Sequence, residues 1–385
     1  MALGILSTYP PAQCGLAKFS ESLRDHLIAG DSDCQVGIVQ VLDSPLPAKR
    51  RAEVVATLDD DPADRAVLEA LNGFDAVIVQ HEYGIYGGQD GEHVTTVLDA
   101  VRRPVIVVLH TVRDQPTEHQ RSVLEQILAR ADRVVVLSRT AARRLREVHG
   151  VPPTEVVDIP HGARVAPPPA LLPGPARPVA SAPRRAAPPT LLSWGLLSPG
   201  KGIEWAIDAV AELRTRGVTA RYLIVGQTHP KVRERFGEAY RDSLKARAEQ
   251  RQVADLVEFD AAYEDEQRLH TLIAGADVIM LPYESKEQVT SGVLIEAVAA
   301  RKPIVATAFP HAVELLGAGA GRLVRHRDSV AMARELRRIL TVPGVAADLT
   351  ARTGRLAPDF AWPAVAGRYR TLAEELVDSA ARLVA

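Results

Sequence analysis

Residues 288 to 296 combine a polar turn, the start of an amphipathic helix and a carboxylate. Thr290, Ser291 and Gly292 stand where the helix begins. A helix N-terminus offers unpaired N–H groups and the positive end of the helix dipole, so it binds anions such as phosphate. One turn further along, Glu296 can reach neutral hydroxyls beside that anion. The pattern suits the diphosphate and ribose of a nucleotide-sugar, and an ordinary helix cap with a solvated glutamate is the alternative.

A second polar motif, from Trp194 to Gly202, follows a strand-like run in the second half of the chain. Lys201 stands there between two glycines at the start of a helix. An ammonium in this position can meet the negative charge that develops on a leaving diphosphate. A solvated surface lysine is the alternative. The segment 225–228, which contains Gly226, follows the next strand in the same way.

Three loops of the first half also follow strand-like runs. Gly15 ends a proline-containing loop at a helix entry, where backbone amides can approach a phosphate, although a plain tight turn fits as well. His81, Glu82 and Tyr83 open a glycine-rich loop that suits either a polar pocket wall or a structural bend. His110 ends the fourth strand and is interpreted either as a cleft residue or as a hydrogen-bonded core histidine.

The elements that carry these motifs alternate between apolar strands and amphipathic helices, such as those at 17–29 and 117–129. This alternation predicts two parallel sheets, each with helices on both faces. The predicted strands are 3–7, 35–41, 75–80, 105–110, 133–137 and 156–159 in the first half and 190–194, 222–225, 257–259, 278–281 and 304–307 in the second. Ligands of such doubly wound sheets bind at the carboxyl ends of the strands, where every motif above stands.

The length and a proline-rich stretch predict where the domains divide. The 385 residues fit two domains of ordinary size. Residues 165–189 hold nine of the 27 prolines and are predicted to be a linker. The first domain is therefore predicted at 1–164 and the second at 190–358. Residues 359–385 are predicted to form a helix that packs back on the first domain.

Composition excludes several classes of protein. The net charge of −2 carries no basic excess, so no nucleic-acid partner is expected. Cys14 and Cys34 lack the spacing of a zinc site or a disulfide framework, which favours a reducing compartment. No export leader is evident, so the protein is expected in the cytoplasm, and a peripheral contact with a membrane stays open. Asp31 and Asp33 form an Asp-x-Asp away from the ligand-binding ends of the strands, and no metal site is predicted.

Taken together in order and spacing, seven motifs resemble those of the retaining family 4 glycosyltransferases of GT-B fold. The resemblance covers nearly all of the chain outside the proline-rich linker. It implies two doubly wound, Rossmann-like domains facing a central cleft. The motifs are TYPPAQCGLAKF near the start, LHT at 109–111, VVVLSRTAARRL at 134–145, IPHG at 159–162, WGLLSPGKGIEWAIDAV at 194–210, VIMLPY at 278–283 and SGVLIEAVAARKPIVAT at 291–307.

The resemblance implies a nucleotide-sugar donor, UDP- or GDP-linked, on the second domain and an acceptor hydroxyl of a sugar, lipid or small metabolite on the first. His110, Lys201 and Glu296 are the expected catalytic residues, and the nucleobase is expected near 258–263. Expected donor contacts are Gly15, Gly195, Lys201, Gly226, Phe259, Gln288, Thr290, Ser291, Gly292, Val293 and Glu296. Expected acceptor-side residues are His81, Glu82 and Tyr83.

Two positions depart from the family pattern. Gln288 replaces the first carboxylate of the usual Glu-x7-Glu pair, and Leu196 replaces a frequent arginine. Lys201 is then expected to carry more of the diphosphate charge. The expected reaction is metal-independent transfer with retention by front-face attack, with no cofactor beyond the nucleotide-sugar co-substrate. A nucleotide-sugar 2-epimerase of the same fold, a catalytically weakened regulatory homologue and a non-enzymatic sugar-binding protein are the alternatives.

Overall fold

The computed structural model describes residues 1–42, 51–152, 155–166, 188–261 and 266–384. The chain forms two compact units. Unit 1 comprises Met1–Gly162 and Asp359–Ala385, and unit 2 comprises Ala163–Pro358. Most of the predicted linker, from 167 to 187, and part of the predicted nucleobase segment, at 262–263, lie outside the described residues.

Unit 1 contains a seven-stranded parallel sheet of order β3-β2-β1-β4-β5-β6-β7. The central strands are buried along nearly their whole length because helices cover both faces of the sheet. The strands are β1 (Ala2–Ser7), β2 (Gln35–Val41), β3 (Val54–Leu58), β4 (Ala76–His81), β5 (Val105–Leu109), β6 (Arg133–Val136) and β7 (Val156–Asp158). The helices are α1 (Gly15–Gly30), α2 (Arg65–Asn72), α3 (His93–Ala100), α4 (Glu118–Leu128), α5 (Arg139–His149) and α14 (Trp362–Val384).

Unit 2 contains a six-stranded parallel sheet of order β10-β9-β8-β11-β12-β13. The predicted pair of parallel sheets is therefore confirmed. The strands are β8 (Thr190–Trp194), β9 (Arg221–Val225), β10 (Val257–Asp260), β11 (Val278–Leu281), β12 (Ile304–Thr307) and β13 (Arg322–Val324). The helices are α6 (Ile203–Thr215), α7 (Pro230–Phe236), α8 (Ala239–Gln250), α9 (Glu266–Gly275), α10 (Gly292–Ala299), α11 (Pro310–Leu316), α12 (Ser329–Thr341) and α13 (Val345–Leu356).

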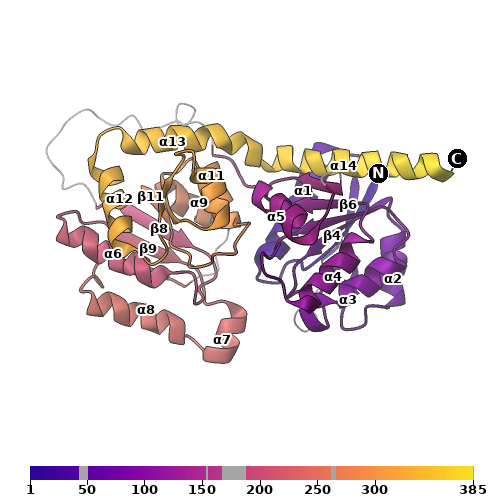
Figure 1. Cartoon of the computed structure of the whole chain (residues 1–385), viewed down its shortest axis with the longest axis horizontal. Coiled ribbons are helices and arrows are strands. Elements are labelled where there is room, and N and C mark those ends of the chain that lie inside the picture. Colours follow the sequence, from indigo (N-terminus) through magenta and orange to yellow (C-terminus); the bar gives the residue numbers. More distant parts are fainter. Residues whose placement is uncertain (43–50, 153–154, 167–187, 262–265, 385) are drawn as a thin grey trace. The chain divides into compact units, whose positions relative to one another are not determined.

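The C-terminal helix α14 completes the core of unit 1 by lying along α1 (Figure 1). Trp362 and Tyr369 of α14 are buried among residues of β1 and α1. A Cβ at Gly162 would lie 2.2 Å from the Trp362 ring, so only glycine lets the indole pack there. No helix among the described residues is long and apolar enough to cross a membrane.

Two short edge strands were absent from the sequence-based prediction. β3 alternates buried and exposed positions, and β13 has only three residues, of which one is fully buried. A strand at the edge of a sheet is half exposed, so it lacks the continuous apolar run that marks the central strands.

Candidate functional site

Lys201 lies where the strand order of unit 2 reverses. β8 and β11 are neighbours in the sheet, yet their connections leave in opposite directions, and such a switch point is the usual ligand site of doubly wound sheets. Lys201 follows β8 and Tyr283 follows β11. The Lys201 ammonium is 4.8 Å from the centroid of the Tyr283 ring. Burial lowers the pKa of Lys201, and no carboxylate in the described ranges contributes to its pKa.

Two glycines fix the loop that carries Lys201. Gly202 has φ of +67°, and a Cβ there would lie 1.9 Å from the Pro282 carbonyl oxygen. The Lys201 N–H donates to the Ser198 carbonyl at 3.1 Å, and the Glu284 N–H donates to the Gly200 carbonyl at 2.9 Å. The loop is therefore attached to the segment that follows β11, which keeps the lysine beside Tyr283.

The N-terminus of α10 faces the same tyrosine. Ser291 caps the helix by accepting a hydrogen bond from Leu294 N–H at 3.2 Å, and its hydroxyl also contacts Tyr283. The Ser291 N–H donates to Nδ1 of His311 at 2.9 Å. Within the described ranges the N–H groups of Gly292 and Val293 donate to no protein acceptor. Of the four amides at 290–293, where an anion site is predicted, only the Ser291 N–H has a protein acceptor among the described residues, and Gly292 and Val293 carry the open amides that belong to α10 itself.

The turn before α10 satisfies much of its own polarity. The Gln288 side-chain amide donates to the Thr290 carbonyl at 3.1 Å. The Thr290 hydroxyl is buried and has no hydrogen-bond partner among the described residues. A buried hydroxyl without a partner is costly unless a ligand or water completes it. Gln288 therefore shapes the turn in this structure, and Thr290 is the side chain with unused hydrogen-bonding capacity.

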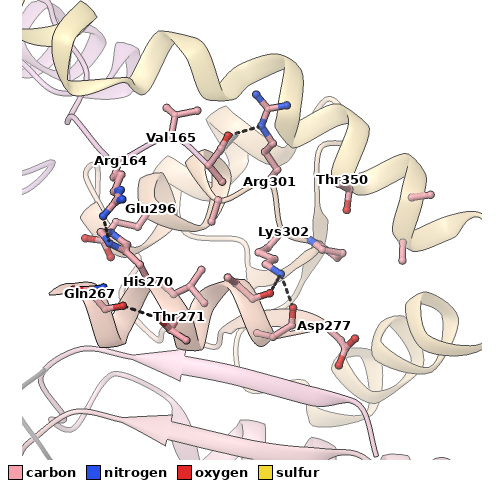
Figure 2. Close-up of a pocket in the computed structure, with 18 residues that line it drawn as sticks. Arg164, Val165, Gln267, His270, Thr271, Asp277, Glu296, Arg301, Lys302 and Thr350 are labelled. Carbon is pink, nitrogen blue, oxygen red and sulfur yellow. Dashed lines mark hydrogen bonds between the residues drawn. The ribbon is translucent and has the colours of Figure 1, made fainter. Parts of the chain in front are cut away.

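Glu296 lines a cavity of about 730 Å³ between α9, α10, α13 and residues 164–166 (Figure 2). Its Oε2 accepts a hydrogen bond from the Trp194 indole N–H at 2.8 Å. Arg164 and His270 lie at the same end of the cavity and contact each other at 3.4 Å. The volume is within the range of small-molecule sites. The Trp194 indole, at the end of β8, thus orients the Glu296 carboxylate, and this carboxylate borders a space large enough for a nucleoside.

Four other predicted donor residues have structural roles inside unit 2. Gly195 and Gly226 have φ of +116° and +135°, and a Cβ on Gly226 would lie 2.1 Å from the Gly195 carbonyl oxygen. The turns after β8 and β9 approach this closely only because both residues are glycine. Val293, on the first turn of α10, packs against Gly195. Phe259 packs against the hydrophobic core from β10, which accounts for its apolar side chain.

His110 follows β5 of unit 1 as a neutral, half-buried imidazole. Its Nε2 is 2.7 Å from Oε1 of Gln80, and its ring meets the Phe19 ring edge-on with centroids 5.0 Å apart. Burial, followed by the nearby His161 and His81, lowers the pKa of His110 to about 3. Gly15 begins α1 in an exposed position, and a Cβ there would meet no atom within 4 Å. Packing therefore gives no reason for a glycine at position 15.

The three predicted acceptor-side residues differ in exposure. His81 is the last residue of β4 and is fully buried, so it would touch an acceptor only if its neighbours moved. Glu82 is half-buried, accepts a hydrogen bond from the Thr111 hydroxyl at 2.5 Å, and has a pKa that burial raises. Tyr83 is buried beneath the Arg113 guanidinium, and burial raises the pKa of Tyr83 to about 12. Of the three, Glu82 is the side chain best placed for a ligand.

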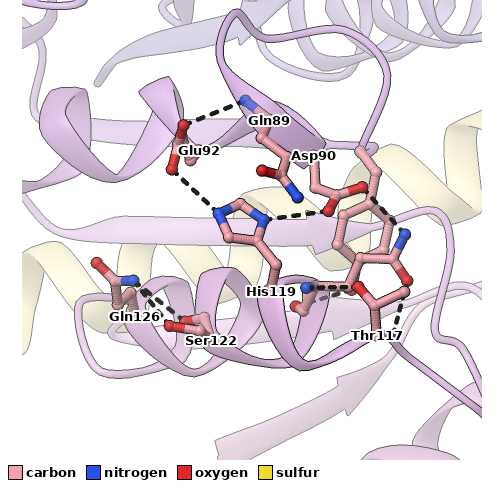
Figure 3. A network of polar contacts seen from close by, with 9 residues as sticks. Gln89, Asp90, Glu92, Thr117, His119, Ser122 and Gln126 are labelled. Carbon is pink, nitrogen blue, oxygen red and sulfur yellow. Dashed lines mark hydrogen bonds and ion pairs between the residues drawn. The ribbon is translucent and has the colours of Figure 1, made fainter.

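The loop that follows these residues is held to α4 by His119 (Figure 3). The Nδ1 atom of His119 is 3.1 Å from Asp90 Oδ2, and Nε2 is 3.2 Å from Glu92 Oε2. Gln120 donates a further hydrogen bond to Asp90 at 3.0 Å. The hydrogen bond to Asp90 is the main reason why the pKa of His119 is raised, with Glu92 contributing as well. A protonated His119 thus pairs with two carboxylates of one loop.

We expect this attachment to weaken as the pH rises. The pKa of His119 is higher in the folded protein than the unfolded value of about 6.5, so its stabilisation is complete below that value and is lost as the pH passes the folded pKa. Hydrogen exchange of residues 84–92, corrected for intrinsic rates, should quicken above about pH 6.5. The side chain of His119→Gln stays neutral at every pH, so exchange in this variant should not quicken over that range. If exchange still quickens in this variant, another titrating group is responsible.

Four residues of the site escaped the sequence-based prediction. Tyr283 and His311 each follow the carboxyl end of a strand of unit 2, which is the signal that could have found them. Trp194 was noted only as part of a motif, although it orients Glu296. Arg164 precedes the linker and carries no local signal. Among the described residues, no group of three or more His, Cys, Asp or Glu side chains is placed to hold a metal ion.

Two family models match the chain on either side of the linker. The model described as "Glycosyltransferase Family 4" matches residues 27–166, and the model described as "Glycosyl transferases group 1" matches residues 188–342. A curated relative, the D-inositol 3-phosphate glycosyltransferase of Kineococcus radiotolerans, is 30% identical over 258 residues, or 63% of this chain and 57% of the relative. The chain spans 56 to 57% of the length of the curated relatives that it matches.

Solved structures with low sequence identity share the fold. The crystal structure of Anabaena Alr3699/HepE in complex with UDP and glucose matches with a TM-score of 0.73 and 18% identity, covering 98% of this chain and 100% of that one. A glycosyltransferase from Rickettsia africae matches with a TM-score of 0.71 and 16% identity, covering 98% and 99%. At this level of identity the likeness concerns the fold alone.

Proposed function

The chain belongs to the family 4 glycosyltransferases (glycosyl transferases group 1) and has the GT-B fold, and on this premise we propose that it transfers a sugar from a nucleotide-diphosphate donor to a hydroxyl acceptor. Unit 2 binds the donor in this proposal, with the diphosphate at Lys201 and the Gly292 and Val293 amides. Glu296 takes the ribose hydroxyls. Unit 1 supplies the acceptor side, with Glu82 and His110 as its polar groups.

The observation that carries the proposal is the environment of Lys201. A half-buried ammonium on which no carboxylate of the described residues acts is costly by itself, and a bound anion would relieve that cost. The Tyr283 ring connects this lysine to the capped N-terminus of α10. Two sources of positive potential therefore adjoin one aromatic side chain, the ammonium over its ring and the capped helix N-terminus at its hydroxyl, and a diphosphate has two charged groups to meet them.

The proposed mechanism needs no protein nucleophile. The acceptor oxygen attacks the anomeric carbon from the face that the diphosphate leaves, so the C–O bond to the acceptor forms as the bond to the diphosphate breaks. The leaving diphosphate takes the acceptor's proton, and Lys201 with the α10 amides stabilises its charge. Because these groups supply the positive potential, we propose that no metal ion is required. The product keeps the anomeric configuration of the donor.

A polyhydroxylated acceptor and a UDP or GDP donor are the substrates to test first. The name of the Kineococcus radiotolerans relative, a D-inositol 3-phosphate glycosyltransferase, supports an acceptor of that polarity. A thermal-shift panel of UDP, GDP and their sugar conjugates should find one nucleotide that raises the melting temperature, because binding to the folded state stabilises it by mass action. The protein would then be assayed with that donor.

We expect activity in the assay to survive EDTA and the product to show the donor's anomeric coupling by proton NMR. Acceptor-dependent release of nucleoside diphosphate is the supporting result. Interconversion of the donor sugar without any acceptor would indicate the epimerase instead. An inverted product, or activity that EDTA abolishes and manganese restores, would overturn the mechanism.

A further inference from the structure

His311 is a fully buried histidine that contacts both ends of the turn 288–291. It lies on α11, which follows β12, and its side chain is 1% exposed. Its Nδ1 accepts a hydrogen bond from Ser291 N–H at 2.9 Å. Its backbone N–H donates to the Gln288 carbonyl at 3.3 Å. One residue of a neighbouring helix thus fixes the first and the last residue of the turn that precedes α10.

The contact with Ser291 defines the state of the imidazole. A backbone N–H can only donate, so Nδ1 must present its lone pair and the proton of the neutral ring must be on Nε2. In this state the ring directs the Ser291 N–H toward α11. The next two amides, those of Gly292 and Val293, then continue the helix from a fixed starting point.

We infer that His311 is a positioning residue for the diphosphate, acting through the turn 288–291 rather than by touching the ligand. The inference rests on the proposed function. A helix N-terminus binds an anion well only if its unpaired N–H groups point at one place. His311 sets that direction by holding Ser291 while Ser291 caps Leu294. No other side chain of the described ranges accepts the Ser291 N–H.

Two substitutions at this position separate hydrogen bonding from volume. His311→Leu introduces an apolar side chain of similar size and leaves the Ser291 N–H without an acceptor. His311→Asn places an amide oxygen near the position of Nδ1 and can accept the same hydrogen bond. Thr353→Val is the matched control, because Thr353 is buried in α13 of the same unit and its hydroxyl donates to the Leu349 and Thr350 carbonyls of its own helix.

The test compares the affinities of a nucleoside diphosphate and of the nucleoside without phosphate by calorimetry or NMR titration. UDP with uridine, or GDP with guanosine, is used according to which one binds the wild type. We expect His311→Leu to weaken diphosphate binding at least tenfold and to leave nucleoside binding unchanged. His311→Asn should recover diphosphate affinity to within threefold of the wild type, and Thr353→Val should change neither affinity.

The possible failures are distinguishable. Wild-type binding by His311→Leu, or an equal loss for nucleoside and diphosphate, overturns the role of His311 while the proposed function stands. A wild type that binds no nucleoside diphosphate overturns the proposed function itself. Hydrogen exchange reports on the turn without any ligand, since His311→Leu should quicken exchange at 291–294 and His311→Asn should not. Unchanged exchange in His311→Leu would show that the histidine does not hold the turn.

Discussion

Lys201→Ala should lower kcat/KM for the nucleotide-sugar about a hundredfold, on the order of 2.7 kcal/mol of transition-state stabilisation. The charge on the leaving diphosphate grows as the glycosidic bond breaks, so an ammonium beside it is worth more in the transition state than in the bound donor. The loss should therefore fall mostly on kcat. Initial rates over a range of donor concentrations would separate kcat from KM.

Lys286→Ala is the matched control for this prediction. Lys286 is an exposed lysine in the segment between β11 and α10, so its removal changes the net charge equally without emptying the position over Tyr283. It should keep kcat within about twofold of the wild type. Equal losses in both variants would indicate a general charge effect, and wild-type kinetics in Lys201→Ala would remove this lysine from the mechanism.

Gly226→Ala should destabilise unit 2 by at least about 3 kcal/mol. The added Cβ would lie 2.1 Å from the Gly195 carbonyl oxygen and 2.9 Å from its carbonyl carbon. Both atoms belong to the backbone of β8's carboxyl end, which cannot turn aside as a side chain can. The φ of +135° is also unfavourable for alanine. Urea unfolding, with hydrogen exchange of residues 190–225 to locate the change, measures the effect.

Gly217→Ala separates the steric overlap from the backbone conformation. Gly217 has φ of +80°, and a Cβ there would meet no atom within 4 Å. The free energy of unfolding of this variant should fall only by the cost of placing alanine at a positive φ, about 1 kcal/mol. Similar losses for Gly217→Ala and Gly226→Ala would show that the contact with Gly195 contributes nothing to the requirement for glycine.

The amino-acid sequence by itself determined the architecture of both sheets and predicted a site at the carboxyl ends of their strands. Runs such as 105–109 and 278–281 are apolar throughout, which happens only when a strand is covered on both faces. Because parallel strands all end at one edge, the motifs that contain Lys201 and Glu296 were predicted at the same edge of the sheet from their positions in the chain. The half-exposed edge strands β3 and β13 were missed for the same physical reason.

The tertiary structure alone decided which of these residues are available to a ligand. Hydrogen bonding and burial depend on partners far away in the chain: Trp194 and Glu296 are 102 residues apart, and Ser291 and His311 are 20 apart. No local pattern reveals such pairs, because a side chain's spacing along its own helix or strand does not show what packs against it. Gly226 is restricted by close approach to the Gly195 backbone, whereas no atom lies near the Cβ position of Gly15. The Ser291 amide is already paired because the fold brings the His311 imidazole within hydrogen-bonding distance of it.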